Sequence, residues 1–286
     1  MNCRVIARLD IKGPNLVKGV HLEGLRVLGK PERFAKHYYE SGIDELVFMD
    51  AVASLYGRNS LLEIIQRTSE RTFIPLTVGG GLRSLDDIQS VLRAGADKVA
   101  LNTAALHNPE IIRQASENFG SSTIVVSIEA KKKEGIYEAY VDNGRQRTRV
   151  NVNDWARQVE DLGAGEILLT SIDREGTGLG YEVDMIRKIA KSVSIPVIAS
   201  GGAGHINHIS SAVIDGRADA ICLASMLHYG YILDYYTDDD YSAEGNTEFL
   251  KSSRVFSKVS CSGVPEIKAH LFGSGIPSRR EKTTRQ

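Results

Sequence analysis

Short apolar runs recur along the chain, and longer stretches with apolar residues at every third or fourth position separate them. Such runs are typical of buried strands, and the spacing between them is typical of helices that bury one face. We predict strands at residues 4–10, 45–50, 75–79, 97–102, 123–129, 166–171, 196–200 and 219–223. We predict helices at residues 31–41, 60–72, 85–94, 109–118, 152–162, 182–191 and 205–214.

This alternation of strand and helix predicts an α/β fold with parallel strands and helical crossovers. The number of units matches a closed (β/α)8 TIM barrel. An open doubly wound sheet is the alternative, although it usually has fewer units and one clear point at which the strand order reverses.

An internal repeat favours the barrel. The segment 45–50 (ELVFMD) resembles 166–171 (EILLTS), and 74–81 (IPLTVGGG) resembles 195–202 (IPVIASGG). Both pairs are offset by 121 residues (166 − 45 and 195 − 74). A repeat of this length is too long for a solenoid and corresponds to half of a barrel.

We therefore predict one domain over residues 1–286, made of two half-barrels at about 1–120 and 121–232. Residues 234–262 are rich in Asp, Ser and Tyr, which predicts an insertion after the last strand. The end of the chain from Pro277 on, including the tail 278–286, is charged and is expected to be frayed.

The composition narrows the class of protein. The formal net charge of −1 gives no indication of a nucleic-acid partner, and no apolar run approaches the ~18 residues of a membrane helix. The chain starts with a strand-like run and no secretory signal, and its three cysteines (Cys3, Cys222 and Cys261) lie far apart. We therefore expect reduced thiols in the cytoplasm, with neither a cofactor nor a metal ion.

Glycine-rich segments follow two strands at symmetric places. Residues 79–81 follow the third strand and residues 201–204 the seventh, while Asn102-Thr103 and Ala224-Ser225 follow the fourth and the eighth. Glycine lets phosphate oxygens approach the backbone N–H groups at this end of a barrel. One glycine run would be explained equally well by a tight turn. Two symmetric runs predict a substrate with a phosphate at each end.

Two carboxylates are placed to act between those phosphate sites. Asp10 ends the first strand and Glu129 ends the fifth, and these strands lie on opposite sides of an eight-stranded barrel. Carboxylates in different surroundings can serve as acid and base. The alternative for these residues is structural ion pairing with Lys12, Arg8 or Lys18.

Charged residues also occur at the opposite ends of the strands. Arg4, Glu45, Lys98 and Glu166 lie at or near the starts of the first, second, fourth and sixth strands. If they point inward, two cations and two anions surround the barrel axis. They would form either a stabilising ring of salt bridges or a gate for a small polar molecule.

Several motifs carry a resemblance to one family. They are residues 8–12 (RLDIK), 17–19 (VKG), 78–81 (VGGG), 96–98 (ADK), 165–174 (GEILLTSIDR) and 199–204 (ASGGAG). Together they resemble the cyclase subunit of imidazole glycerol phosphate synthase, the HisF family. The resemblance covers roughly residues 1–232 and a short stretch near 265–280.

The resemblance implies a lyase reaction in histidine biosynthesis. A partner glutaminase (HisH-like), bound as a heterodimer, releases ammonia, which passes through the barrel. The ammonia attacks a bis-phosphorylated ribulosyl aminoimidazole carboxamide ribotide, giving imidazole glycerol phosphate and an aminoimidazole carboxamide ribotide.

The resemblance also implies roles for individual residues. The catalytic pair falls on Asp10 and Glu129, the lysine of a mobile loop on Lys18, and a contact with the glutaminase on Asp97. The ammonia gate falls on Arg4, Glu45, Lys98 and Glu166. The phosphate contacts fall on Gly81, Asn102 and Thr103 at one end, and on Gly176, Gly202, Ala224 and Ser225 at the other.

This sequence departs from the family at the predicted active face. Glu129 replaces an Asp, and a displacement near ~1 Å can cost on the order of 10²-fold in rate. Glu175 replaces the Asp that precedes Gly176, and Gly13-Pro14 follows Lys12 where the family has an acid. Arg8 places a cation where the family has a small residue.

These departures keep other functions open. The first hypothesis is the histidine-pathway cyclase. The second is a HisF-like ammonia-delivery subunit that serves amidino-sugar formation in surface-polysaccharide biosynthesis. The third is the related sugar isomerase of histidine synthesis, which fits the first and sixth strand motifs less well.

Overall fold

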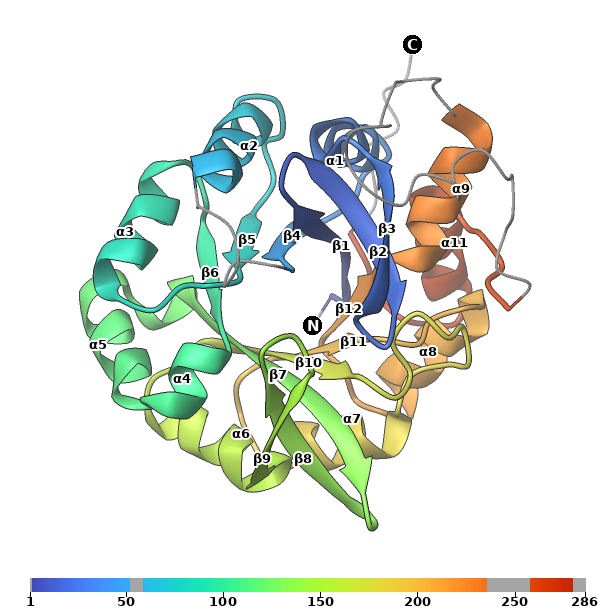
Figure 1. Cartoon of the computed structure of the whole chain (residues 1–286). Helices are drawn as coiled ribbons and strands as arrows, with labels where there is room; N and C mark the ends of the chain where they lie inside the picture. Colours follow the sequence, from blue (N-terminus) through green and yellow to red (C-terminus); the bar gives the residue numbers. More distant parts are fainter. Residues whose placement is uncertain (1, 52–58, 236–257, 280–286) are drawn as a thin grey trace.

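Eight parallel strands close into a barrel in the computed structural model, which describes residues 2–51, 59–235 and 258–279 (Figure 1). The barrel strands are β1 (Arg4–Lys12), β4 (Glu45–Asp50), β5 (Leu76–Gly79), β6 (Lys98–Leu101), β7 (Ile124–Lys133), β10 (Glu166–Ser171), β11 (Val197–Ser200) and β12 (Ala220–Leu223). Pairing of β10 with β7 and of β12 with β1 closes the sheet. The predicted (β/α)8 barrel is confirmed, and the alternative of an open doubly wound sheet is wrong.

Helices surround the barrel at every predicted place. They are α1 (Pro31–Glu40), α2 (Asn59–Ser69), α3 (Leu85–Arg93), α5 (Glu110–Phe119), α6 (Val152–Asp161), α7 (Val183–Ala190) and α8 (Ile206–Ile214). The start of α3 shows how the sequence sets a boundary. The Ser84 hydroxyl accepts from Asp87 N, and Asp87 Oδ2 accepts from Ser84 N at 3.0 Å, so two free N–H groups of the first turn are satisfied.

Two antiparallel hairpins extend the barrel and were not predicted. One consists of β2 (Asn15–Val20) and β3 (Glu23–Gly29), and the other of β8 (Ile136–Val141) and β9 (Gln146–Asn151). They continue β1 and β7 beyond the barrel mouth (Figure 1). The hairpins meet where Leu22 packs with Tyr140 and Ile172, so the mouth is covered from two opposite strands.

Side chains inside the barrel form a small apolar cluster of their own. Its members are Ile6, Val47, Met49, Ala100, Val125, Leu168, Ile198, Ala220 and Cys222. The larger core lies outside the barrel strands, between them and the helices. Strand alternation explains the division, because Val125 faces the axis while its neighbours Ile124 and Val126 join the outer core.

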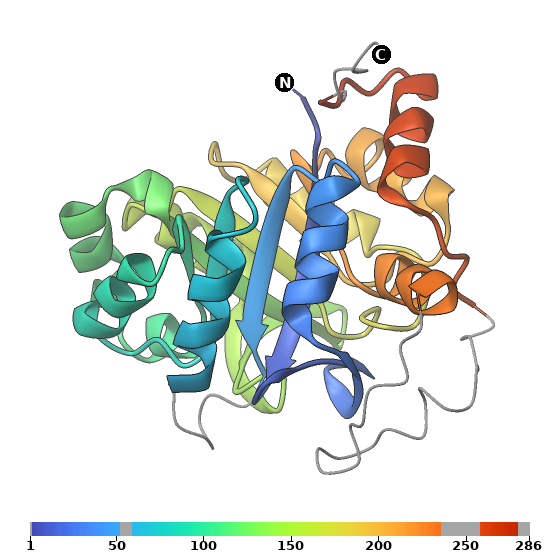
Figure 2. The same ribbon diagram turned by 90° about the horizontal axis from the view of Figure 1, so that it is seen from above.

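The end of the chain adds further helices, seen at the side of the barrel in Figure 2. Helix α9 (Ser225–Tyr235) overlaps the predicted insertion 234–262 by two residues, and α11 (Val264–Gly273) follows that insertion. Val259 is buried, and Ser260 N donates to Gly204 O at 2.7 Å. Most of the predicted insertion, 236–257, lies outside the described residues, and the insertion stays a prediction.

The prediction that the chain is frayed from Pro277 on is wrong for Pro277 and Ser278. Cys3 N donates to Pro277 O at 2.7 Å, and Cys3 pairs with Ser278 in a parallel bridge. Pro277 and Ser278 are therefore paired with Cys3, the residue just before β1. Residues 280–286 lie outside the described part. Among the residues described, no helix has the length and apolar character needed to span a membrane.

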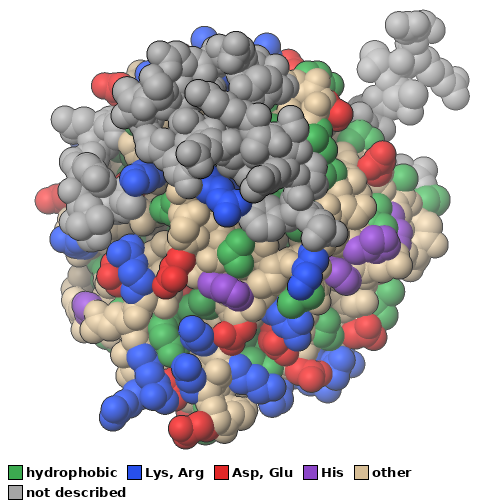
Figure 3. All heavy atoms as spheres, turned by 45° about the vertical axis from the view of Figure 1, so that its right-hand side comes forward, with side chains coloured by type: hydrophobic (Ala, Val, Ile, Leu, Met, Phe, Trp, Pro, Cys, Tyr) green, Lys and Arg blue, Asp and Glu red, His purple; other side chains and the backbone are tan. Residues whose placement is uncertain are grey.

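Acidic and basic side chains lie interspersed on the described part of the face in Figure 3, in keeping with the small net charge. Cys3 and Cys222 are buried, Cys261 is partly buried, and all three are free thiols. Burial raises the pKa of Cys3 and of Cys222 to about 12, so both stay protonated at neutral pH.

Candidate active site

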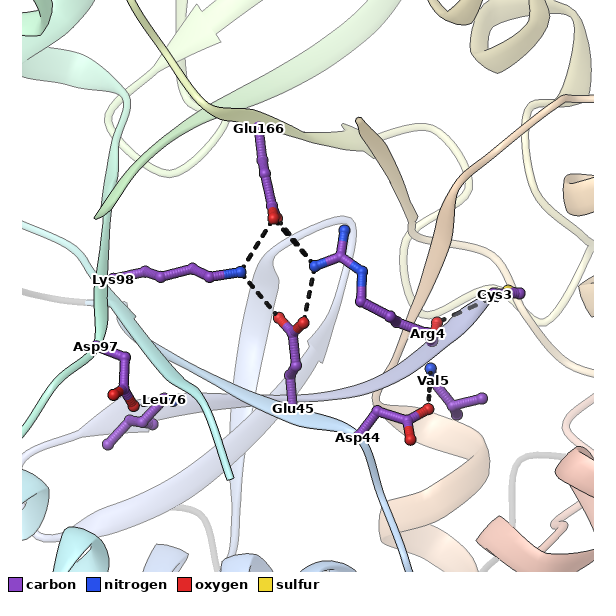
Figure 4. A network of polar contacts seen from close by, with 9 residues as sticks. All are labelled: Cys3, Arg4, Val5, Asp44, Glu45, Leu76, Asp97, Lys98 and Glu166. Atoms are coloured by element: carbon purple, nitrogen blue, oxygen red, sulfur yellow. Dashed lines mark hydrogen bonds and ion pairs between the residues drawn. The ribbon is translucent and has the colours of Figure 1, made fainter. Parts of the chain in front are cut away.

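Four charged side chains form a closed ring at the N-terminal end of the barrel strands (Figure 4). Arg4 Nη1 lies 2.7 Å from Glu45 Oε1 and 3.0 Å from Glu166 Oε1. Lys98 Nζ lies 3.4 Å from Glu45 Oε2 and 3.0 Å from Glu166 Oε1. The structure thus brings together all four residues that the sequence singled out.

The ring alternates cation and anion, so each charge has two partners of opposite sign. Arg4 is the most exposed member, with 25% of its side chain accessible, whereas Glu45 has 7%. The apolar cluster inside the barrel lies directly above, since Ile6 and Val47 are two residues further along their strands. A small polar molecule that entered from below would therefore pass the ring before reaching an apolar interior. Its role as a gate stays a prediction.

Asp97 has a structural contact beside this ring. Its Oδ2 accepts from Leu76 N at 2.8 Å (Figure 4). Asp44 makes the same contact with Val5 N at 2.8 Å, and Asp219 with Val197 N at 2.9 Å. Three aspartates thus cap the N–H groups of neighbouring strands in the same manner. The predicted contact of Asp97 with a glutaminase stays a prediction.

Asp10 lies at the other end of β1 and is 6% exposed. Arg8 Nε donates to Asp10 Oδ1 at 2.8 Å, which is the structural ion pair considered from the sequence. Burial opposes ionisation of Asp10, but the Arg8 guanidinium and Lys18 outweigh it, so its pKa is held below the ordinary value. Asp10 is therefore a carboxylate at neutral pH and can accept a proton.

Glu129 lies on β7, across the barrel from Asp10, and is 3% exposed. Its Oε2 has no hydrogen-bond partner among the described residues, while the carboxylate accepts from Gly144 N. Burial raises the pKa of Glu129 to about 7, and Asp10 adds to the rise while Arg8 opposes it. Two buried carboxylates with pKa values shifted in opposite directions are an arrangement suited to acid–base chemistry.

The first predicted phosphate site lines a cavity of about 330 Å³. Gly81, Asn102 and Thr103 all face it, and so does Glu129. Gly80 shows why glycine is needed, because a Cβ there would lie 2.5 Å from Asp50 O. The side-chain Oδ1 of Asn102 is buried without a hydrogen-bond partner in the described part of the chain. The cavity can therefore hold a polar ligand within reach of Glu129.

The second predicted phosphate set does not line that cavity. Gly176 packs on the hairpin β2–β3, where a Cβ would lie 2.6 Å from Gly19 O, and Gly202 packs on Gly180. Ala224 follows β12, and Ser225 begins α9 with its side chain buried. The four residues lie in the segments that follow β10, β11 and β12, as expected from the sequence. Phosphate binding by them stays a prediction.

Lys18 lies on the hairpin β2–β3 and is 2% exposed. Its Nζ forms an ion pair with Glu175 and donates to Gly19 O at 3.2 Å. Sequence reasoning named Lys18 as a loop residue and Glu175 as a departure but did not connect them. The only available signal was the opposite charge of two residues in different loops.

A buried histidine near Asp10 was also missed. His228 on α9 bonds through Nε2 to Arg8 O at 2.9 Å and through Nδ1 to the Tyr38 hydroxyl at 2.7 Å. Burial lowers its pKa to about 3, with Lys18 contributing, so the ring is neutral at physiological pH. His228 follows a stretch that is apolar except for Ser225, and nothing in the sequence marked it as more than a core residue.

A closed (β/α)8 barrel with a charged ring at one end and two buried carboxylates at the other is the architecture of a barrel enzyme. The model of the family described as histidine biosynthesis protein matches residues 4–233, so the chain belongs to that family.

Named relatives make the family assignment more specific. The imidazole glycerol phosphate synthase subunit HisF of Legionella pneumophila is 58% identical over 210 residues, which cover 73% of this chain and 99% of the relative. The subunits HisF of a Nostoc species and of Methanocaldococcus jannaschii are each 46% identical, over 80% and 79% of this chain and 90% of either relative. The resemblance drawn from the motifs is confirmed.

Proposed function

We propose that Asp10 and Glu129 act as the base and acid of a cyclase that works on a substrate with a phosphate at each end. The activity is that of the cyclase subunit of imidazole glycerol phosphate synthase in histidine biosynthesis. The observation that carries the residue roles is the difference in partners of two buried carboxylates that lie across the barrel from each other. Asp10 is paired with Arg8, whereas Glu129 Oε2 has no hydrogen-bond partner among the described residues. Their pKa values are shifted in opposite directions, in keeping with this difference.

The geometry supports a substrate stretched across the barrel mouth. Its first phosphate would occupy the cavity beside Gly81, Asn102 and Thr103. Its second would lie at the ends of β10, β11 and β12, and its reacting centre between the carboxylates. Ammonia would arrive along the barrel axis, past the ring of Arg4, Glu45, Lys98 and Glu166.

The ammonia source is a glutaminase subunit bound at the N-terminal face of the barrel, in a cytoplasmic heterodimer. Apolar side chains surround this face: Phe73 is 78% exposed, Ile214 58% and Phe272 59%. They lie at the C-terminal ends of helices or in loops that precede strands, at the same end of the barrel at which the ring residues begin their strands. Exposed apolar residues around a charged centre fit a protein partner.

The test supplies the purified chain with ammonium at high pH and the ribulosyl substrate, without a glutaminase. Formation of imidazole glycerol phosphate is expected, with Asp10→Asn and Glu129→Gln each lowering kcat by at least ~10²-fold. Lys133→Met, on the exposed end of β7, is the matched control and should retain activity. No product from the unaltered chain would refute the cyclase role.

A second candidate is ammonia delivery to a sugar acceptor in surface-polysaccharide biosynthesis. Two observations favour it: Asp10 is already paired with Arg8, and the second phosphate set lies apart from the cavity. In that case Asp10→Asn would leave glutamine-dependent transfer intact, while Lys98→Met would alter it. The identity of neighbouring genes would separate the two functions at little effort.

A further inference from the structure

Arg8 is a charged residue in the interior of the barrel with almost no exposure. It lies on β1 between Ile6, which belongs to the inner apolar cluster, and Asp10. Its side chain is 3% exposed. A guanidinium in such a place must be paired, because an isolated buried charge is very unfavourable.

The guanidinium is held at two points. Nε donates to Asp10 Oδ1 at 2.8 Å, and Nη1 donates to Thr170 Oγ1 at 3.3 Å. Thr170 lies on β10, which β11 and β12 separate from β1 in the barrel. The side chain therefore reaches across the interior from one strand to another, and its direction is fixed.

The backbone of Arg8 is fixed as well. Its carbonyl oxygen accepts from His228 Nε2 at 2.9 Å. Because that nitrogen carries the proton, Nδ1 accepts from the Tyr38 hydroxyl at 2.7 Å. Tyr38 and His228 are fully or almost fully buried, so the chain from α1 through α9 to β1 is shielded from water.

The two carboxylates near Arg8 differ in their partners. Asp10 receives a directed ion pair, whereas Glu129 Oε2 is buried without a hydrogen-bond partner in the described part of the protein. The charged and titratable groups that face Asp10 are Arg8 on the same strand, Lys18 from β2, His228 from α9, Glu129 from β7 and Cys222 from β12. Those that face Glu129 are Arg8 and Asp10 from β1, and Asp142 from the β8–β9 turn.

We propose that Arg8 is a positioning residue that holds Asp10 as the base and leaves Glu129 to act as the acid. This inference rests on the proposed acid–base function of the two carboxylates. It assigns a role to a residue at which this chain departs from the pattern of the family it resembles.

The division of roles gives a balanced proton transfer. When ammonia attacks the ketose carbonyl, a C–N bond forms and the C=O π bond breaks. Asp10 takes one proton from the attached nitrogen, and Glu129 gives its proton to the oxygen. One proton then passes from Asp10 to Glu129 by way of solvent, which restores both groups.

The first test needs no turnover, so it remains readable if the proposed reaction fails. Carboxyl carbons are labelled with ¹³C in the full chain, and the signals are assigned by comparison with Asp10→Asn and Glu129→Gln. In the unaltered protein Asp10 should stay ionised while Glu129 titrates near neutrality. In Arg8→Met the midpoint of Asp10 should rise by at least about one pH unit, because its opposite charge is lost. An unchanged Asp10 midpoint would overturn the proposal.

The second test follows catalysis. The acidic limb of the kcat/KM profile should move to higher pH in Arg8→Met, and added guanidinium chloride should move it back. Thr170→Val loosens the far end of the guanidinium and should shift the limb less, in the same direction. If Arg8→Met lowers the rate and the melting temperature without moving the limb, Arg8 is merely structural and the proposal fails.

Discussion

Lys18 on the hairpin β2–β3 and Glu175 in the loop after β10 form an ion pair in which both side chains are almost completely buried. Glu175 also holds the hairpin through its backbone and its second oxygen, since its O accepts from His21 N at 2.9 Å and its Oε2 from Leu22 N at 3.4 Å. Glu175 therefore holds the hairpin over the barrel mouth through three contacts.

Glu175→Gln should destabilise the protein strongly, because it leaves the Lys18 ammonium buried without an opposite charge. Breaking one side of a buried pair costs about 3–5 kcal/mol. The double variant Lys18→Met with Glu175→Leu should recover much of this loss, which urea unfolding of the single and double variants would measure. Lys36→Met, in an exposed pair with Glu40 at 3.6 Å, is the control. If Glu175→Gln and Lys36→Met lowered the free energy of unfolding equally, Lys18 would not be held by this pair.

The stability of the protein should depend on the charge of Glu129. Its folded-state pKa of about 7 lies above the ordinary value of 4.5, so the native state binds the proton more tightly than the unfolded chain. The stability that protonated Glu129 contributes is fully present below its ordinary pKa of 4.5 and is lost as pH rises through about 7. Glu129→Gln should therefore become progressively more stable than the unaltered protein, by about 3 kcal/mol above neutrality.

Free energies of unfolding in urea, measured at several pH values from weakly acidic to weakly basic, would test this. Glu134→Gln changes an exposed residue in the β7–β8 turn and should run parallel to the unaltered protein. A parallel curve for Glu129→Gln as well would mean that Glu129 ionises normally in the folded state.

The ring at the N-terminal face should control how ammonia is used rather than whether the chemistry occurs. Lys98→Met leaves Glu45 and Glu166 with Arg4 as their remaining partner in the ring. We expect a several-fold fall in the ratio of glutamine-dependent to ammonium-dependent activity, measured with the glutaminase bound. Lys268→Met is the control, because Lys268 pairs with Asp44 at the same end of the barrel but outside the ring. A ratio unchanged in Lys98→Met would leave the ring a purely structural feature.

The barrel was predictable from the sequence because each strand is a short apolar run and each helix keeps a regular apolar face. The ring was predictable for the same reason, since Arg4 and Glu45 begin strands whose alternation fixes which side chains face the axis. Asp10 and Glu129 followed from the same rule at the opposite ends.

The hairpins could not be predicted in this way. Residues of β2 and β8 mix polar and apolar side chains, and their burial depends on contacts such as Leu22 with Tyr140, which join segments far apart in the chain. The pairs Lys18–Glu175 and Arg8–Thr170 are likewise set by the closure of the barrel. Sequence spacing carries no information about such contacts until the fold is known.

The protein should lose stability in acid because of His228. Its folded-state pKa of about 3 lies below the ordinary 6.5, so the native state resists protonation that the unfolded chain accepts. The stability that neutral His228 contributes is fully present above its ordinary pKa of 6.5. It is lost as pH falls toward about 3, at about 1.4 kcal/mol per pH unit. His228→Gln should flatten this part of the stability curve at the expense of some stability near neutrality. Urea unfolding between neutral and weakly acidic pH would measure the slope, with His107→Gln, an exposed histidine, as the control. An equally steep slope in His228→Gln would assign the acid sensitivity to other groups.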